Sequence, residues 1–536
     1  MSRLAGRLSA SPFTATTLRI GGLALLAGLF LFVYLYNIGS NPAGMFCDEA
    51  QIGVEAYRLP MGEADLQPIP LFVRNFDYVH LGVMPALSTM PFVWLFGADE
   101  FGIRLAAAAM TLATLLLLYI TLHRLKIPFP SLAVALFGLS PAVIHVGRVN
   151  LGHAPSMLLL ALGFYLYVRA RTQHSAYLAV AAGLCFGLGA YSNGPFYVFV
   201  PMLIAAIGIG ESCFNGRNWR DWKPYAWTAG VCALLMLPFA YELLTNPEFL
   251  KRFADKQFSH YQLLSGARLL EMIANYPKYF SIDYLFRVGE TGLPGGWITR
   301  HSVPGAGELN WMLLPMLALA VIGLVRCWRH PSMRFLVPWV AIAIAYPFPD
   351  LLTATAANPP YTFALMGATL AIPFLAALGL LGLWSLLPER PRLAMAAASL
   401  MLLATLGFGM RFYMGPYQAY PLISAGWFGW QFGPRQMIGY FKAHADDYDY
   451  FLMDGNYNGA VAFLELYLTD PEMRRKATLN DLRLFDPTKR QLFSVRAEVW
   501  NNQYDAAWPA KDLLRVLAVI PYPNGEPAVY MVEARR

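Results

Sequence analysis

The stretch IGGLALLAGLFLFVYLYNI, residues 20–38, contains no charged residue and, wound into a helix, is about as long as a bilayer core is thick. Arg3, Arg7 and Arg19 precede it, a basic flank of the kind that stays in the cytoplasm. A signal peptide would have a shorter apolar region followed by an A-x-A cleavage pattern, which the next residues do not contain. We therefore expect a retained first membrane helix with a cytoplasmic N-terminus.

The rest of the chain is equally apolar. Of its 536 residues, 57% are hydrophobic and 14% are charged, whereas soluble proteins are roughly 45 to 50% apolar and about 25% charged. The apolar residues fall in blocks that predict about eleven membrane spans, although several blocks are short. The ten blocks after the first are 102–122, 131–146, 156–168, 177–191, 196–210, 225–244, 309–325, 335–352, 363–387 and 393–410.

Basic residues lie in alternate connections between these blocks, for example at Arg124, Arg169, Lys223, Arg329 and Arg390. By the positive-inside rule these connections are cytoplasmic, so the intervening loops and the tail face outward. The net charge of +7 is explained by this orientation, and no nucleic-acid partner is expected. The apolar block 83–96 is too short for a span and is expected to lie on the outer membrane face.

From about residue 415 the composition becomes that of a soluble protein. Strands are predicted at 449–453, 514–520 and 529–533 and a helix at 460–468, with a Pro-Asn-Gly-Glu hairpin turn at 523–526. The five cysteines form no pattern typical of a disulfide framework or a metal site.

The predicted fold is therefore a polytopic α-helical membrane protein with a small C-terminal extra-cytoplasmic α/β domain. Residues 1–414 form the transmembrane domain, with outer loops at 39–101 and 245–308, and residues 415–536 form the soluble domain.

Two adjacent acids, Asp48 and Glu49, follow the first span in the sequence AGMFCDEAQIG, residues 43–53. Adjacent carboxylates repel each other and so hold protons more tightly, which can poise one of them as a base in a partly dehydrated cleft. A solvated helix cap is the alternative interpretation of an isolated acid pair.

An ordered series of motifs follows the acid pair: Asp77-Tyr-Val-His80, then Pro85 in the interfacial block, then Gly102 and Arg104 at the start of the second span. This series resembles the first outer loop of the GT-C glycosyltransferases, in particular the superfamily of protein O-mannosyltransferases and aminoarabinose transferases. Members usually have Pro directly after the His, where this chain has Leu81. The resemblance implies the GT-C fold.

A second match lies at Arg148 and His153, after the third span. Mannosyltransferases place an arginine here and an acid five residues later, so Arg148 matches and His153 replaces the acid. The alternative is that Arg148 extends to the membrane interface and His153 is a hydrogen-bonded helix start.

The resemblance implies an enzyme that transfers a hexosyl or pentosyl group, with inversion, from a polyprenyl-phosphate carrier to an acceptor on the outer face. The acceptor is a protein, lipid A or another cell-envelope glycan. Asp48 would be the base and Glu49 would tune it, orient it or hold the acceptor. Arg148 would bind the leaving phosphate, because arginine stays charged and contacts two oxygens at once.

Asp77 and His80 would shape the acceptor side, although His80 could equally bond the loop backbone. Further candidates for substrate binding are Arg58 and Arg300, with Arg268, Arg287 and Arg411 in reserve. No metal or other cofactor is required, although the two acids could bind a divalent cation through oxygen.

The expected location is the bacterial inner membrane, with membrane lipid as a further partner. A transporter or lipid flippase is the main alternative, because many spans with polar residues are also what a substrate pathway needs. A membrane scaffold is a third, but it would leave the acid and histidine motifs without a purpose.

Overall fold

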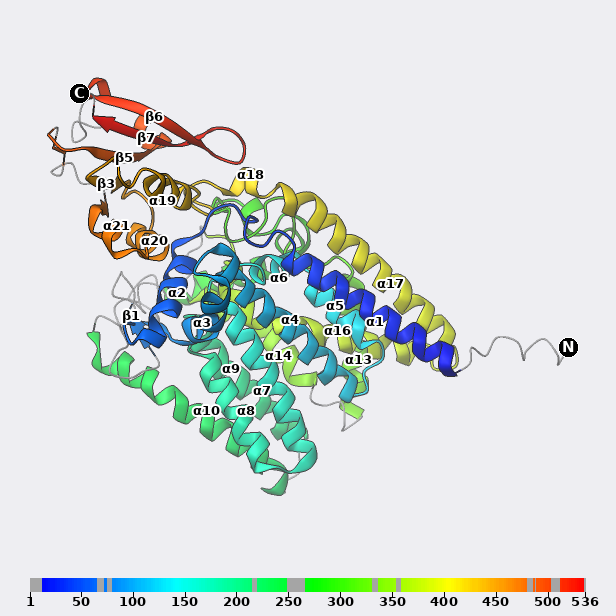
Figure 1. Cartoon of the computed structure of the whole chain (residues 1–536). Coiled ribbons are helices and arrows are strands. Elements are labelled where there is room, and N and C mark those ends of the chain that lie inside the picture. The colour runs from blue at the N-terminus through cyan, green and yellow to red at the C-terminus, as the bar shows by residue number, and fades with distance from the viewer. Residues whose placement is uncertain are drawn as a thin grey trace.

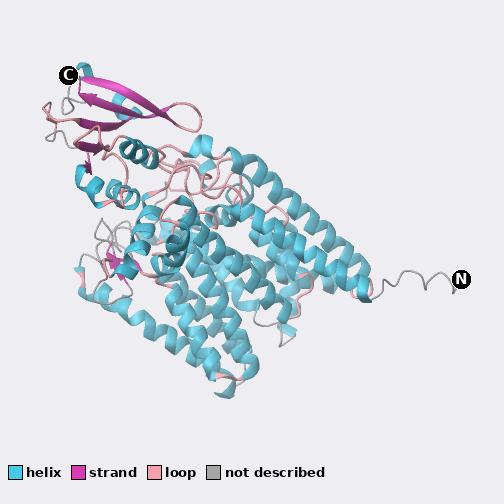
Figure 2. Ribbon diagram, in the orientation of Figure 1, coloured by secondary structure: helices cyan, strands magenta, loops and turns pink. Residues whose placement is uncertain are grey.

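The computed structural model describes residues 12–64, 72–74, 80–214, 219–247, 266–329, 336–352, 358–479, 485–486, 488–502 and 511–534. Helices form a large bundle, and a small sheet lies at one end of it (Figures 1 and 2). The first predicted span and most later ones are single helices, as expected. They are α1 (Pro12–Leu35), α4 (Glu100–Arg124), α7 (His153–Gln173), α8 (Ala176–Gly189), α9 (Phe196–Phe214), α10 (Trp219–Thr245), α13 (Leu313–Arg329) and α17 (Pro391–Phe412).

Three predicted spans are broken or irregular. The block 131–146 forms α5 (Pro130–Gly138) and α6 (Pro141–Val146), and the block 335–352 forms α14 (Val337–Ala345) and α15 (Phe348–Leu351). A 3₁₀ helix, η6 (Thr362–Leu370), precedes α16 (Ala371–Leu386). Proline explains the first two breaks, because Pro141 and Pro347 lack the N–H that would continue the preceding helix.

Shorter elements gather at the end of the bundle that carries the sheet (Figure 1). From the first outer loop they are α2 (Cys47–Arg58), η1 (Leu59–Met61), β1 (Phe72–Arg74), β2 (His80–Gly82) and α3 (Met84–Phe96). From the second they are α12 (Gly266–Asn275), η2 (Tyr276–Phe280), η3 (Asp283–Arg287) and η4 (Glu290–Gly292), and after α17 come η7 (Tyr413–Tyr417) and α18 (Pro421–Ser424).

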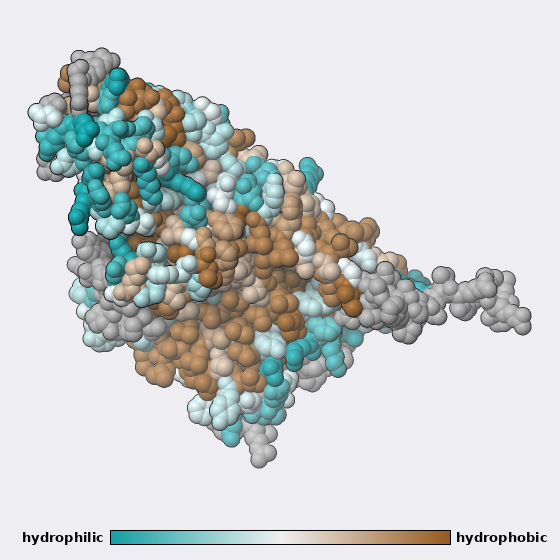
Figure 3. Space-filling model, in the orientation of Figure 1, coloured by the Kyte–Doolittle hydropathy of each residue, from teal (hydrophilic) through white to brown (hydrophobic). Residues whose placement is uncertain are grey.

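Four helical segments among the described residues are long and apolar enough to cross a membrane: Glu100–Arg124, Trp222–Thr245, Thr362–Leu386 and Pro391–Tyr417. Five shorter apolar helices lie at Ile20–Leu35, Met84–Phe96, Ala176–Gly189, Phe196–Ser212 and Leu313–Arg326. Figure 3 shows that apolar side chains cover the helical part, whereas hydrophilic ones cover much of the end with the sheet. This distribution is typical of a helical membrane protein.

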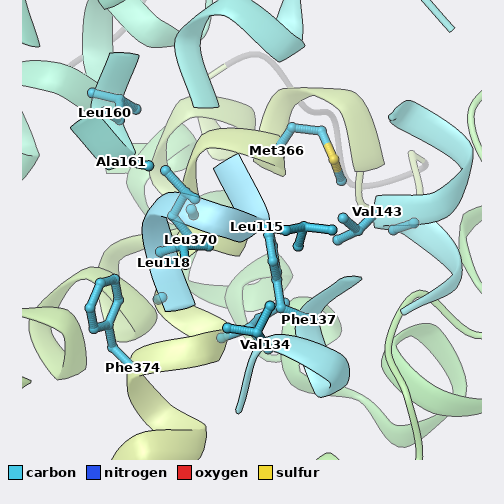
Figure 4. Packing of buried hydrophobic residues seen from close by; sticks show 14 of the residues in the cluster. Leu115, Leu118, Val134, Phe137, Val143, Leu160, Ala161, Met366, Leu370 and Phe374 are labelled. Atoms are coloured by element: carbon cyan, nitrogen blue, oxygen red, sulfur yellow. The ribbon is translucent and has the colours of Figure 1, made fainter. Parts of the chain in front are cut away.

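The core of the bundle is built around η6 and α16, whose apolar residues are almost completely enclosed. Figure 4 shows Met366 and Leu370 of η6, Leu115 of α4, Phe137 of α5 and Leu160 of α7, which all belong to one buried cluster. By contrast, most of α10 and α17 faces outward, so these two helices are on the periphery, where lipid would contact them.

The C-terminal residues form a five-stranded sheet in the order β4-β3-β5-β7-β6. Its central strand β5 (Gln491–Arg496) is buried throughout and parallel to β3 (Tyr450–Met453), which is parallel to β4 (Ala477–Leu479). The predicted hairpin is confirmed: β6 (Leu514–Pro521) and β7 (Pro527–Ala534) are antiparallel, and Tyr522 N–H donates to Glu526 O at 2.7 Å across the turn. The accompanying helices are α19 (Pro434–Ala443), α20 (Ala460–Tyr467), α21 (Pro471–Lys476), α22 (Ala497–Asn502) and η9 (Lys511–Leu513).

Helices α13 and α16 pack closely because glycines line their contact. A Cβ atom at Gly323 would lie 1.8 Å from the carbonyl oxygen of Leu378, and one at Gly379 would lie 2.4 Å from that of Met316. Small residues allow membrane helices to approach to backbone contact.

We expect Gly323→Ala to lower the melting temperature of the detergent-purified protein, because the added methyl group forces the helices apart at a cost of about 1–3 kcal/mol. Gly407→Ala in α17 is the matched control, since a Cβ there meets nothing within 4 Å, and alanine favours a helix interior over glycine. Equal melting temperatures for the two variants would contradict the assigned packing.

Candidate active site

The two adjacent acids begin α2 and point to different surroundings. Phe46 is the N-cap residue, and both acids lie in the first helical turn, where the helix dipole favours negative charge. Asp48 is exposed, whereas Glu49 is fully buried. Consecutive side chains on a helix project about 100° apart, so one carboxylate faces solvent while its neighbour enters the protein.

Glu49 makes a two-pronged ion pair with Arg104 of α4, and neither side chain is exposed. The guanidinium Nε donates to Oε1 at 3.1 Å and Nη2 to Oε2 at 2.9 Å. Asn150 N–H also donates to Oε1, at 2.9 Å. These donors enclose the Glu49 carboxylate, so it fixes the start of α2. The expected roles of Glu49, which are to tune or orient Asp48 or to hold the acceptor, stay predictions.

Arg104 also holds the chain between α1 and α2. Its Nη1 donates to Pro42 O at 2.8 Å and its Nη2 to Gly44 O at 2.6 Å. The guanidinium lies 5.6 Å from the ring centroid of Trp430, in the segment before α19. One buried cation therefore joins α4, α2 and the segment that precedes Asp48.

Arg148 is fully buried and binds backbone carbonyl groups, which differs from the expectation that it faces a lipid phosphate. It donates to Val33 O at 2.5 Å and to Tyr36 O at 2.8 Å, at the carboxyl end of α1. Its guanidinium lies 5.4 Å from the ring of Tyr413 and 5.2 Å from that of Tyr417. A cation at a helix C-terminus satisfies carbonyls that lack intrahelical partners, so Arg148 caps α1.

His153, which stands where the family has an acid, has different neighbours from Arg148. Its Nε2 lies 3.4 Å from Asn193 Nδ2, and its ring packs beside Phe196 and Phe363. It is the first residue of α7 and is buried. This placement agrees with the alternative interpretation, in which His153 is a hydrogen-bonded residue at the start of a helix.

The other candidates of the first loop are placed only in part. Arg58, at the end of α2, forms an ion pair with Glu465 of α20 at 2.7 Å. His80 begins β2, where it pairs with Arg74 of β1, and its side chain lies outside the described residues. Asp77 lies wholly outside them.

Arg300 of the second outer loop lies beside the start of α2. Its guanidinium is 4.0 Å from the ring centroid of Phe46, two residues before Asp48. Its Nη1 donates to Phe428 O at 3.2 Å, and its carbonyl oxygen lies 2.7 Å from His145 Nε2 of α6. Because Arg300 is half-buried rather than enclosed, it can still contact a ligand.

Tyr361 belongs to the candidate site, although the sequence analysis assigned no role to it. Burial raises the pKa of its phenol, Arg300 lowers it, and Glu290 and Asp48 raise it further. Tyr361 is therefore within electrostatic range of both Asp48 and Arg300. Its signal in the sequence is only a Pro-Pro-Tyr before an apolar block, which does not reveal these neighbours.

The described residues contain no group of three or more His, Cys, Asp or Glu side chains placed to hold a metal ion. The expectation that no resident metal is required stays a prediction. The chemical features of the site are thus an exposed carboxylate, a half-buried guanidinium and a phenol.

Solved structures show which fold this is. ArnT from Cupriavidus metallidurans bound to undecaprenyl phosphate aligns over 96% of this chain and 98% of its own, with a TM-score of 0.55 and 13% identity. The oligosaccharyltransferase of Archaeoglobus fulgidus, in complex with Zn and sulfate, aligns over 95% of this chain and 72% of its own, with a TM-score of 0.50 and 12% identity. The chain has the GT-C fold of membrane glycosyltransferases.

Sequence comparisons show which membrane glycosyltransferases the chain resembles. The model of the dolichyl-phosphate-mannose-protein mannosyltransferase family matches residues 82–241. The undecaprenyl phosphate-alpha-4-amino-4-deoxy-L-arabinose arabinosyl transferase 2 of Pseudomonas fluorescens (strain Pf0-1) is 26% identical over 321 residues, which are 55% of this chain and 54% of that protein. A counterpart in Pseudomonas paraeruginosa (strain DSM 24068 / PA7) is 27% identical over 313 residues, 55% of this chain and 53% of its own.

The chain thus spans about half the length of the curated relatives it matches. The resemblance found in the motifs is confirmed: the chain is similar to the aminoarabinose transferases within the GT-C superfamily.

The geometry around Glu49 predicts a large loss of stability in Glu49→Gln. The variant leaves Arg104 as a buried cation without a carboxylate, and breaking a buried pair in this way costs about 3–5 kcal/mol. Glu465→Gln, which breaks the partly exposed pair with Arg58, should cost about 1 kcal/mol or less. Thermal unfolding of the purified variants measures both, and equal losses would contradict the assigned role of Glu49.

Proposed function

We propose that this chain is a glycosyltransferase that moves a sugar from a polyprenyl-phosphate carrier to an acceptor at the outer face of the membrane. The observation that carries the proposal is that the guanidinium of half-buried Arg300 lies 4.0 Å from the ring centroid of Phe46, two residues before the exposed carboxylate of Asp48, at the end of the helical bundle that carries the sheet. Transfer from a phosphate carrier needs a base for the acceptor and a cation for the leaving group.

In the proposed reaction the acceptor hydroxyl attacks the anomeric carbon, and Asp48 takes the hydroxyl proton. The bond between that carbon and the phosphate oxygen breaks on the opposite face, which inverts the configuration. Polyprenyl phosphate leaves with the bonding electron pair, and Arg300 stabilises its negative charge. The sugar is a pentose or a hexose, and the acceptor is a protein, lipid A or another envelope glycan.

The donor follows from two considerations. ArnT, whose fold this chain shares, was solved with undecaprenyl phosphate bound. A carrier lipid also suits a site at the end of a helical bundle with an apolar surface (Figure 3), because the prenyl chain can stay in the bilayer while its phosphate reaches the site.

The proposed orientation has about eleven spans, a cytoplasmic N-terminus and the site facing outward in the bacterial inner membrane. Arg124 ends α4, whose first residue, Glu100, contacts Tyr467 and Arg435 of the C-terminal part. Arg124 therefore lies at the end of α4 away from the C-terminal part, which supports the assignment of its basic connection to the cytoplasm by the positive-inside rule. Residues 1–414 then form the catalytic domain, and residues 415–536 an extra-cytoplasmic α/β domain.

We expect Asp48→Asn to reduce sugar transfer by about 10² to 10⁴-fold, the usual contribution of a general base, while the protein stays folded because this side chain is exposed. Mass spectrometry of lipids and envelope glycans from cells that express either form measures transfer, and the melting temperature serves as the folding control. Near-normal transfer by the variant would exclude Asp48 as the base.

Arg300→Ala should weaken binding of undecaprenyl phosphate about tenfold or more, since it removes a charge-assisted contact to phosphate. Arg287→Ala is the matched control in the same loop, because Arg287 is exposed and pairs with Asp283 at 2.8 Å. Titration of undecaprenyl phosphate into the two purified variants compares them. Equal affinities would remove Arg300 from the donor site.

A further inference from the structure

The outer end of the bundle contains three buried carboxyl groups that the proposed reaction does not use. Glu290, Glu308 and Asp350 are 4%, 3% and 2% exposed, respectively. Burying a carboxyl group is costly unless hydrogen bonds compensate. The partners of these three groups therefore indicate what they do.

Glu290 joins two segments that are far apart in sequence. Its Oε1 lies 2.5 Å from His301 Nδ1, and its Oε2 accepts the Thr362 N–H at 2.7 Å. His301 directly follows Arg300, and Thr362 directly follows Tyr361. The two oxygens of one carboxyl group thus fix the residues next to the guanidinium and the phenol of the site.

Further contacts support the same two segments. Asp350 Oδ2 accepts the Tyr361 N–H at 2.7 Å and the Tyr279 hydroxyl at 2.8 Å. The His301 ring lies 4.3 Å from the Tyr361 ring, and Glu308 Oε1 accepts the Glu290 N–H at 2.9 Å. Glu308 also bonds Thr362 and Ser302, but Glu290 is the carboxyl group that contacts the residues directly next to both Arg300 and Tyr361.

We propose that Glu290 is a positioning residue for the donor site, which holds Arg300 and Tyr361 at a fixed separation through His301 and Thr362. The inference rests on the proposed function in one respect, because that function identifies the ligand as a polyprenyl phosphate. The hydrogen bonds of Glu290 are a property of the fold and can be tested without it.

The protonation of Glu290 gives this role a pH dependence. Burial raises the pKa of its carboxyl group to about 8 and lowers the pKa of His301 well below its usual range. Burial also raises the pKa of the adjacent Glu308 carboxyl group to about 8. As the pH rises through about 8 these two carboxyl groups become negative near a site for an anionic ligand. The titratable and charged groups around it are Arg300, Glu308, Tyr279 and Tyr284 of the loop, Tyr361 before η6, Asp350 of α15 and His145 of α6.

Titration of undecaprenyl phosphate into the purified full chain tests the role. Glu290→Gln keeps an acceptor for Thr362 and a donor for His301, so it should bind like the unmodified protein at about pH 7. Glu290→Ala should bind about tenfold more weakly. Between about pH 7 and pH 9 the unmodified protein should lose more affinity than Glu290→Gln, in which Glu308 is the one of these two carboxyl groups that can still ionise. Asp283→Asn, an exposed acid of the same loop, is the control.

Hydrogen exchange at the Thr362 amide is the second measurement, and it needs no ligand. Exchange should accelerate in Glu290→Ala and stay slow in Glu290→Gln. Unchanged exchange in Glu290→Ala, or equal affinity and equal pH profiles for all forms, would overturn the role of Glu290. Failure of the unmodified chain to bind undecaprenyl phosphate, with the exchange results as expected, would instead overturn the proposed function. If Glu290→Ala does not fold, identical pH profiles for Glu290→Gln and the unmodified protein would overturn the inference.

Discussion

The buried ion pair between Arg104 and Glu49 is the interaction on which the site depends. Its members come from α4, one of the long apolar helices, and from α2, which carries the outer acid pair. Because Arg104 also binds Pro42 O and Gly44 O, the chain entering α2 has little freedom. With Glu49 fixed inward, helical geometry directs Asp48 outward.

The C-terminal part also packs against α2. Helix α20 packs on α2, where a Cβ at Gly53 would lie 3.0 Å from Leu466, and Glu465 pairs with Arg58 at 2.7 Å. At Gly459 a Cβ would lie 2.8 Å from that of Cys47, the residue before Asp48. The sheet and its helices thus contribute to the placement of the proposed base. This structural role of the C-terminal part does not depend on which acceptor the enzyme uses.

Hydropathy and turn chemistry predict most of the architecture, because apolar blocks must be helical in a bilayer and an Asn-Gly turn favours a hairpin. They do not predict which arginine faces a ligand. Arg148 and Arg300 both lie at the end of the bundle near α2, but the first is enclosed by α1 and η7 and the second is not. Glu290, His301 and Thr362 become neighbours only in the folded chain, so their spacing in the sequence carries no signal.

The partners of the buried charges favour the proposed enzyme over the alternative of a transporter. A substrate pathway through a membrane needs polar groups that exchange partners as the substrate passes. Arg104 and Arg148, two fully buried cations of the described part of the chain, instead bind a carboxylate and backbone carbonyls that belong to the fold itself. Releasing them would break the connection between α1, α2 and α4. The accessible groups, Asp48 and Arg300, belong to the same end of the bundle, where Arg300 contacts Phe46. This placement suits the proposed reaction at the membrane surface better than passage across it.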